Sequence, residues 1–141
     1  WVEVRLADVL LKLAEAEMRL GHYDVAMGHI AKIRSRVGLP TDTTLTGDEA
    51  FEALIHERKI ELAYEGHLWW DMRRWRLSEE AYTGYRVHGL KITKEGSGYR
   101  YQYVDADGQD RKFLNRMYRL PIPDAELQNN NAIEQFPEWN F

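Results

Sequence analysis

The chain has 141 residues, of which 44% are hydrophobic and 30% are charged, so it is expected to fold around one core and is too apolar for a disordered protein. Its net charge of −4, with acidic and basic residues interspersed, excludes the basic stripe that is typical of nucleic-acid-binding proteins. The absence of cysteine excludes disulfides, thiolate catalysis and cysteine-ligated metal sites in this chain.

The first residues of the chain are typical of a sequence that starts inside a longer protein. It opens at Trp1 without an initiator Met or a charged leader and passes directly into a helical pattern. No apolar run approaches the roughly 20 residues that span a bilayer. We therefore expect a piece of a longer polypeptide whose targeting signals lie upstream.

Residues 1–40 carry the pattern of two helices. In the first, apolar residues at three- and four-residue steps predict an inward stripe, which consists of Leu6, Val9, Leu10, Leu13, Ala16 and Leu20. Charged side chains are expected on another face, namely Asp8, Lys12, Glu15 and Arg19. The second helix has an inner stripe of Ala26, Met27, Ile30, Ile33 and Val37. Because Gly21 leaves only a short turn between them, the two helices should pack antiparallel as a tetratricopeptide-like pair.

Residues 46–77 predict further helices. The segment Thr46-Gly47-Asp48-Glu49 has the S/T-x-x-E form of a capping box, so a third helix is expected to start there. It should run to about Glu65, with Gly66 near its end. A short helix or tight helical turn is expected to follow over residues 67–75.

Residues 85–119 change in character, because glycines there separate short alternating segments. Residues 99–104 alternate as a strand does, and Asp107-Gly108 is a dipeptide typical of hairpin turns. The tail, residues 120–141, is expected to be irregular, with one short helical turn near 124–127. The predicted fold class is therefore mainly α, with a tetratricopeptide-like helix pair, further helices, a small β-hairpin insertion and an irregular C-terminal tail.

Arg58 is the most informative charged residue of the third helix. Its position falls in the middle of the apolar arc, so its guanidinium is expected to point inward and to need anionic partners. Glu61 and Glu65 fall on the same side, and Asp71 could fold back to the same place. An acid/base pair with shifted pKa values is one interpretation. A buried structural ion network of these four residues is the interpretation favoured here.

The motifs of catalysis and of metal binding are incomplete. The segment His56-Glu57-Arg58-Lys59-Ile60 begins like the zinc-protease H-E-x-x-H, but isoleucine replaces the second histidine. No phosphate-binding glycine loop and no nucleophile-elbow motif is present. The sequence therefore predicts no enzyme, no cofactor and no metal site.

The aromatic residues are the candidate ligand contacts. Tyr99, Tyr101 and Tyr103 project from one face of the expected strand, where they either cover the helical core or present a ligand surface. Trp69, Trp70 and Trp75 could form a platform for sugar stacking, but beside a helix end they more often fill a core or a domain interface.

Four segments together resemble the SusD/RagB family. The run ALIHERKIELAYEGHLWWDMRRW at residues 53–75 resembles the family pattern E-R-R-x-E-L-A-x-E-G-x-R-[WF]-x-D-L-x-R-W. LADVLL with AEA at 6–16, IRSRVGLP at 33–40 and LPIPDAEL at 120–127 resemble further family segments in the same order. Lys59 and His67 stand where the pattern often has arginine, and residues 78–118 match poorly.

The resemblance implies the C-terminal portion of a surface-exposed lipoprotein of Bacteroidetes outer membranes, anchored by a lipid on an upstream cysteine. Such proteins bind glycans or other nutrients without catalysis and pass them to a SusC-like TonB-dependent transporter. The resemblance also implies that the signature around Arg58 is structural. The alternative function is a tetratricopeptide-like helical adaptor that binds a peptide or a protein, and a glycoside hydrolase would need a pair of carboxylates that no pattern here marks.

Overall fold

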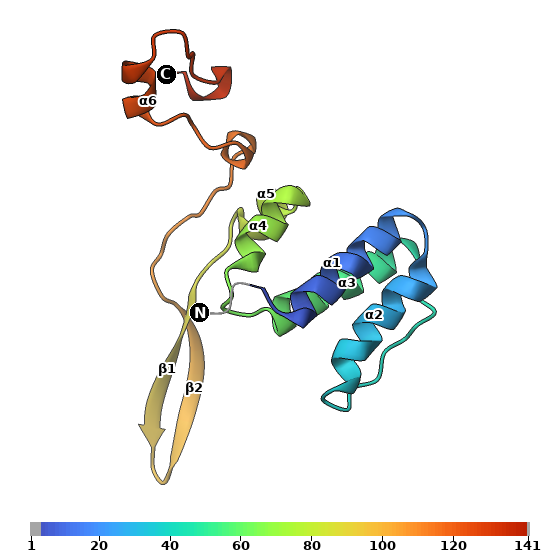
Figure 1. The fold of residues 1–141 in the computed structure, drawn as a ribbon. Coiled ribbons are helices and arrows are strands. Elements are labelled where there is room, and N and C mark those ends of the chain that lie inside the picture. The colour runs from blue at the N-terminus through green and yellow to red at the C-terminus, as the bar shows by residue number, and fades with distance from the viewer. Residues whose placement is uncertain (1–3, 141) are drawn as a thin grey trace. The chain divides into compact units, whose positions relative to one another are not determined.

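The structure is a computed structural model that describes residues 4–140 and divides into two compact units, Trp1–Asp71 and Met72–Phe141. Between residues 4 and 140 it contains six α-helices, two short 3₁₀ helices and one two-stranded sheet (Figure 1). This confirms the predicted mainly α fold with a small β-hairpin insertion. Within the same residues, none of the helices has the length and apolar character needed to cross a membrane.

The first unit is built on three helices, α1 (Leu6–Arg19), α2 (Tyr23–Ser35) and α3 (Gly47–Glu61). α1 and α2 lie side by side and run antiparallel (Figure 1), because Gly21 takes a positive φ of 84° and reverses the chain within a short turn. The core between the three helices consists of Leu11, Ala14, Met18, Ala26, Met27, Ile30, Ile33, Ala50, Leu54 and Leu62. The predicted inner stripe of α2 is thus buried except for Val37, which is exposed.

The buried face of α1 differs from the predicted one. Leu6, Val9, Leu13 and Leu20 were expected to point inward, but all four are exposed. The buried side chains of this helix are instead Asp8, Leu11, Ala14, Glu15 and Met18. Both sets follow the helical period, so spacing could not distinguish them. The structure buries the second set because its two carboxylates have cationic partners at Lys12 and Arg19 and, for Asp8, also at Arg58.

Helix α3 is shorter than predicted. It ends at Glu61 rather than near Glu65, and Leu62 leaves the helical conformation with φ −103° and ψ 22°. Tyr64 and Gly66 then take positive φ values of 64° and 82°, which turn the chain before α4 (His67–Arg74). The expected capping box is not formed, since the side chain of Thr46 makes no hydrogen bond at the start of α3.

The second unit contains α5 (Ser78–Tyr82) and a β-hairpin of β1 (His88–Glu95) and β2 (Gly98–Asp105). The strands pair antiparallel and meet at Gly96-Ser97, where Gly96 takes the positive φ of 58° that tight hairpin turns favour. The prediction that Asp107-Gly108 forms the hairpin turn is wrong, because the strand that pairs with β2 precedes it in the sequence. The tail contains the 3₁₀ helices η1 (Asn115–Tyr118) and η2 (Pro137–Trp139), with α6 (Asp124–Asn129) between them.

Candidate functional site

Arg58 lies at the centre of a buried group of charges in the first unit. Its side chain is only 2% exposed. Its Nε donates to Oδ2 of Asp71 over 2.6 Å, and its Nη2 lies 3.5 Å from Oδ1 of Asp8 on α1. A guanidinium buried to this degree needs such anionic partners, because an unpaired charge in the interior is strongly disfavoured. Arg58 and Asp71 are therefore brought together as the sequence predicted.

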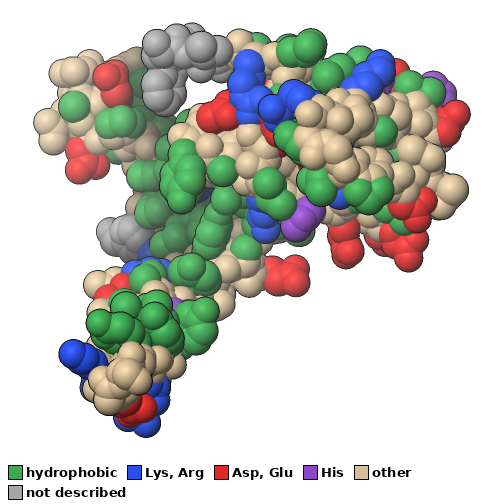
Figure 2. Space-filling view, turned by 90° about the horizontal axis from the view of Figure 1, so that it is seen from below, with side chains coloured by type: hydrophobic (Ala, Val, Ile, Leu, Met, Phe, Trp, Pro, Cys, Tyr) green, Lys and Arg blue, Asp and Glu red, His purple; other side chains and the backbone are tan. Residues whose placement is uncertain are grey.

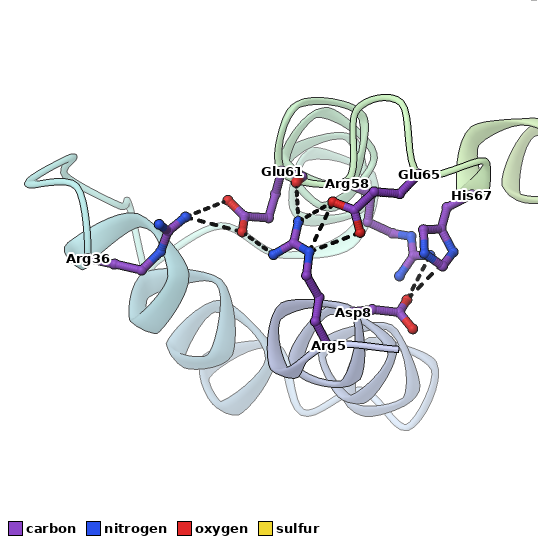
Figure 3. Close-up of polar contacts among 7 residues, drawn as sticks. All are labelled: Arg5, Asp8, Arg36, Arg58, Glu61, Glu65 and His67. Atoms are coloured by element: carbon purple, nitrogen blue, oxygen red, sulfur yellow. Dashed lines mark hydrogen bonds and ion pairs between the residues drawn. The ribbon is translucent and has the colours of Figure 1, made fainter. Parts of the chain in front are cut away.

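Glu61 and Glu65 bind a different arginine from the predicted one. Nη1 of Arg5 lies 2.6 Å from Oε1 of Glu61, and its Nη2 lies 2.7 Å from Oε1 of Glu65 (Figure 3). Arg36 adds a second ion pair to Glu61 at 3.0 Å. The prediction assumed that α3 continues to residue 65. Since the helix ends at Glu61, Glu65 leaves the arc of Arg58 and reaches Arg5, just before α1.

Asp8 and Arg5 are the members of the network that sequence reasoning missed. The side chain of Asp8 is fully buried, and its Oδ2 accepts a hydrogen bond from Nζ of Lys12 over 2.7 Å. His67 lies 3.9 Å from Oδ1 of the same carboxylate (Figure 3). The only sequence signal for this burial is that Asp8 shares a helical face with Leu11 and Ala14. Its partner Arg58 is 50 residues away, which no local pattern reveals.

Two carboxyl groups of the network, those of Asp8 and Glu65, have lowered pKa values. Burial raises the pKa of Asp8, but the hydrogen bond from Lys12 and the charges of Lys12, His67 and Arg58 outweigh it, so the pKa lies below its ordinary value. The hydrogen bond from Arg5 likewise lowers the pKa of Glu65. Both pKa values are thus shifted away from neutral pH, whereas a general acid or base needs a pKa near the pH at which it acts. These contacts support a structural interpretation of the network.

The tyrosine face of the hairpin is the candidate ligand surface. We use this name for Tyr99, Tyr101 and Tyr103 of β2 together with Leu90 and Ile92 of β1. The register pairs Tyr103 with Leu90 and Tyr101 with Ile92, which places all five side chains on one face. The three tyrosines are 61%, 62% and 80% exposed.

Figure 2 shows hydrophobic side chains gathered on the hairpin, at the lower left of that view. Exposed apolar and aromatic side chains in one contiguous band are uncommon on a soluble surface unless they bind something. Tyrosines there add flat rings for stacking and hydroxyl groups for hydrogen bonds. Within its own unit the hairpin leaves Tyr99, Tyr101 and Tyr103 exposed, which is compatible with the predicted ligand surface. Ligand contact by these residues stays a prediction.

Trp69 and Trp70 of α4, and Trp75 directly after it, are not part of the buried core, and a role in a domain interface stays a prediction. Trp69 and Trp70 are both exposed, and Trp75 is half-buried with the guanidinium of Arg74 at 4.6 Å from its ring.

Comparison with known proteins places these features in one family. A family model described as the SusD family matches residues 1–139. SusD-like protein P2 of Formosa agariphila is 30% identical over 99% of this chain, and SusD-like protein P25 of the same organism is 33% identical over 92%. This chain covers 26% and 22% of those two relatives, so it spans about a quarter of their length.

Solved structures show the same likeness. The crystal structure of a SusD-like protein from Bacteroides fragilis matches 99% of this chain with a TM-score of 0.85 and 29% identity. A SusD superfamily protein from Bacteroides vulgatus matches 97% of it with a TM-score of 0.67 and 30% identity. The chain covers 26% and 27% of those two proteins.

Proposed function

This chain belongs to the SusD family, and on that premise we propose that it is part of a cell-surface protein that binds glycans or other nutrients without chemical change. The proposal extends to delivery of the ligand to a SusC-like TonB-dependent transporter in the outer membrane. It also includes attachment to that membrane by a lipid outside this chain. Family membership supports these roles, since the resemblance of residues 53–75 and 120–127 implies them.

The exposed tyrosine face is the observation within this chain that best supports ligand binding. Sugar rings present apolar C–H faces and polar edges, and a tyrosine offers a matching flat ring with a hydroxyl group. Tyr99, Tyr101 and Tyr103 stand at alternate positions, about 7 Å apart along the strand. The three rings therefore form a row along the strand.

The non-catalytic part of the proposal rests on the state of the charged groups. Asp8 and Glu65 are held ionised by cations, whereas a glycoside hydrolase needs one carboxyl group that stays protonated near neutral pH. Asp105 on the hairpin also has a lowered pKa, because its side chain accepts backbone hydrogen bonds from Gly108 and Asp107. These three carboxylates serve as anions in ion pairs and turns.

A helical adaptor is the second candidate, and the exposed stripe of α1 is what favours it. Leu6, Val9, Leu13 and Leu20 lie on the solvent side of a tetratricopeptide-like pair, where a peptide or another helix could pack. The adaptor would bind protein rather than sugar.

Titration of the intact protein with a panel of neutral and acidic oligosaccharides, followed by tryptophan fluorescence, separates the two candidates. Saturable change with an oligosaccharide supports nutrient binding. No response to any sugar, together with retained binding of a peptide that Leu13→Glu abolishes, would instead establish the adaptor. Copurification of the intact protein with a TonB-dependent transporter from detergent-solubilised outer membranes tests the delivery step.

A further inference from the structure

The second unit contains an open cavity whose lining is strongly basic. The cavity has a volume of about 510 Å³ and is lined by Arg76, Asn115, Arg116, Tyr118, Arg119 and Glu138. Glu138 forms an ion pair with Arg119, whose Nη1 lies 3.5 Å from its Oε1. Three guanidinium groups against one carboxylate leave the cavity with an excess of positive charge.

Aromatic rings hold the three guanidinium groups in place. Arg76 lies 4.5 Å from the ring centroid of Tyr118, Arg116 lies 5.1 Å from that of Trp139, and Arg119 lies 4.6 Å from that of Phe136. A guanidinium that contacts a ring with its face keeps the N–H groups at its edge for other partners.

Hydrogen bonds fix two of those rings in turn. Nε1 of Trp139 donates to the carbonyl oxygen of Arg119 over 2.8 Å, and the hydroxyl of Tyr118 accepts from the backbone N–H of Glu79 over 3.1 Å. The arginines are therefore positioned before any ligand arrives, which lowers the entropy cost of binding.

The backbone of Arg76 gives a second and independent reason to assign this cavity a ligand. Arg76 takes a positive φ of 62° directly after α4, at a position where helices usually end in glycine. The N–H of Arg76 bonds the carbonyl of Arg73, and that of Leu77 bonds the carbonyl of Met72, as such a glycine-terminated end requires. A side chain in this conformation costs stability that glycine would not, and such strain gathers where a side chain has a role. Among residues 4–140 no carboxylate forms an ion pair with Arg76.

We propose that this cavity binds an oxyanion, namely the carboxylate or sulfate group of an acidic saccharide. Guanidinium groups match the planar, paired oxygens of such anions and bind them with charge-assisted hydrogen bonds. Arg76 supplies the charged donors, and the amide of Asn115 adds a neutral one. The site is separate from the tyrosine face. Its assignment to a saccharide rests on the proposed function, whereas binding of an oxyanion does not.

Calorimetric titration of the intact protein at constant ionic strength tests the proposal, with sodium sulfate, galactose 6-sulfate and unsubstituted galactose as the probes. The informative variant is Arg76→Gly, which removes the cation while glycine suits the positive φ. The matched control is Arg100→Gln, which removes an exposed arginine of the same unit that forms an ion pair with Glu95 on the hairpin.

The expected result is saturable binding of sulfate and of galactose 6-sulfate by the wild type and by Arg100→Gln. In Arg76→Gly, which should keep its melting temperature or gain in it, both affinities should fall by at least about tenfold. If galactose 6-sulfate binds more tightly than free sulfate, the site contacts the sugar as well as its sulfate group. If the two bind equally, the site contacts the oxyanion alone. Failure of the wild type to bind either anion, or wild-type affinity in a folded Arg76→Gly, would overturn the proposal.

Discussion

Nε of Arg58 in α3 lies 2.6 Å from Oδ2 of Asp71 in α4, and both side chains are almost completely buried. The two residues are 13 positions apart, and the chain between them leaves the helix at Leu62 and turns through Tyr64 and Gly66. The ion pair therefore connects the last turn of α3 to the middle of α4 across that turn. Its burial makes it sensitive to the loss of either partner.

Arg58→Ala is expected to lower the free energy of unfolding by about 3 kcal/mol, because it leaves the buried carboxylates of Asp71 and Asp8 without their shared cation. Urea denaturation followed by circular dichroism measures the loss. Arg36→Ala is the control, since Arg36 is mostly exposed and its ion pair with Glu61 should contribute at most about 1 kcal/mol. Equal losses in the two variants would contradict the structural role of Arg58.

Acid should destabilise the protein through Asp8 and Glu65. Their folded pKa values lie below the ordinary values of 3.8 and 4.5, so the stability that they contribute is fully present above about pH 5 and is lost as the pH falls through the folded values. Asp8→Asn is expected to be less stable at pH 7 and to lose less stability between pH 5 and pH 3 than the wild type. Urea midpoints across this range provide the measurement. Glu52→Gln, an exposed position on α3, should keep the wild-type slope, and a wild-type slope in Asp8→Asn as well would argue against this role of the buried carboxylate.

Two leucines of α1 test which face of that helix is buried. Leu11 is 0% exposed and Leu13 is 41% exposed, so Leu11→Ala should cost about 2–5 kcal/mol and Leu13→Ala less than about 1 kcal/mol. Denaturation of the two variants under the same conditions gives the comparison. A larger loss for Leu13→Ala would restore the face predicted from the sequence.

Tyr101→Ala should weaken oligosaccharide binding by about tenfold, since loss of one stacking ring removes roughly 1–1.5 kcal/mol. Tyr101 stands at the middle of the tyrosine face and is cross-strand from Ile92. Gln102→Ala, which alters the opposite face of the same strand, is the matched control and should bind as the wild type does. Calorimetry with the tightest oligosaccharide of the panel measures both, and equal affinities would remove the tyrosine face from the ligand site.

Local patterns predicted elements better than they predicted faces and partners. The helical period predicted α1, but it suited both Leu6, Val9 and Leu13 and the stripe that is buried, Leu11, Ala14 and Met18. Which of these stripes is buried depends on how α1 packs against α2 and α3. The spacing of apolar residues within one helix carries no information about that packing. The apolar arc of α3 predicted that Arg58 points inward, and it does.

Ion pairs between residues far apart in the sequence could not be predicted for the same reason. Glu61 and Glu65 pair with Arg5, which lies 56 and 60 residues earlier, and Asp8 reaches Arg58 across 50 residues. The hairpin shows a local failure of a different kind. Asp107-Gly108 is a dipeptide that hairpin turns favour more than Gly96-Ser97, yet β2 pairs with the strand before it, around Gly96-Ser97.

The claim that this chain is part of a binding protein and not of an enzyme is tested most directly by recovering the ligand. The intact protein is incubated with an oligosaccharide to which calorimetry shows saturable binding, and the sugar is then analysed by mass spectrometry and for reducing ends. A protein that binds the sugar without changing it should bind it stoichiometrically and release it at its original mass after prolonged incubation. Shortened oligosaccharides, or reducing ends that increase with time, would contradict it.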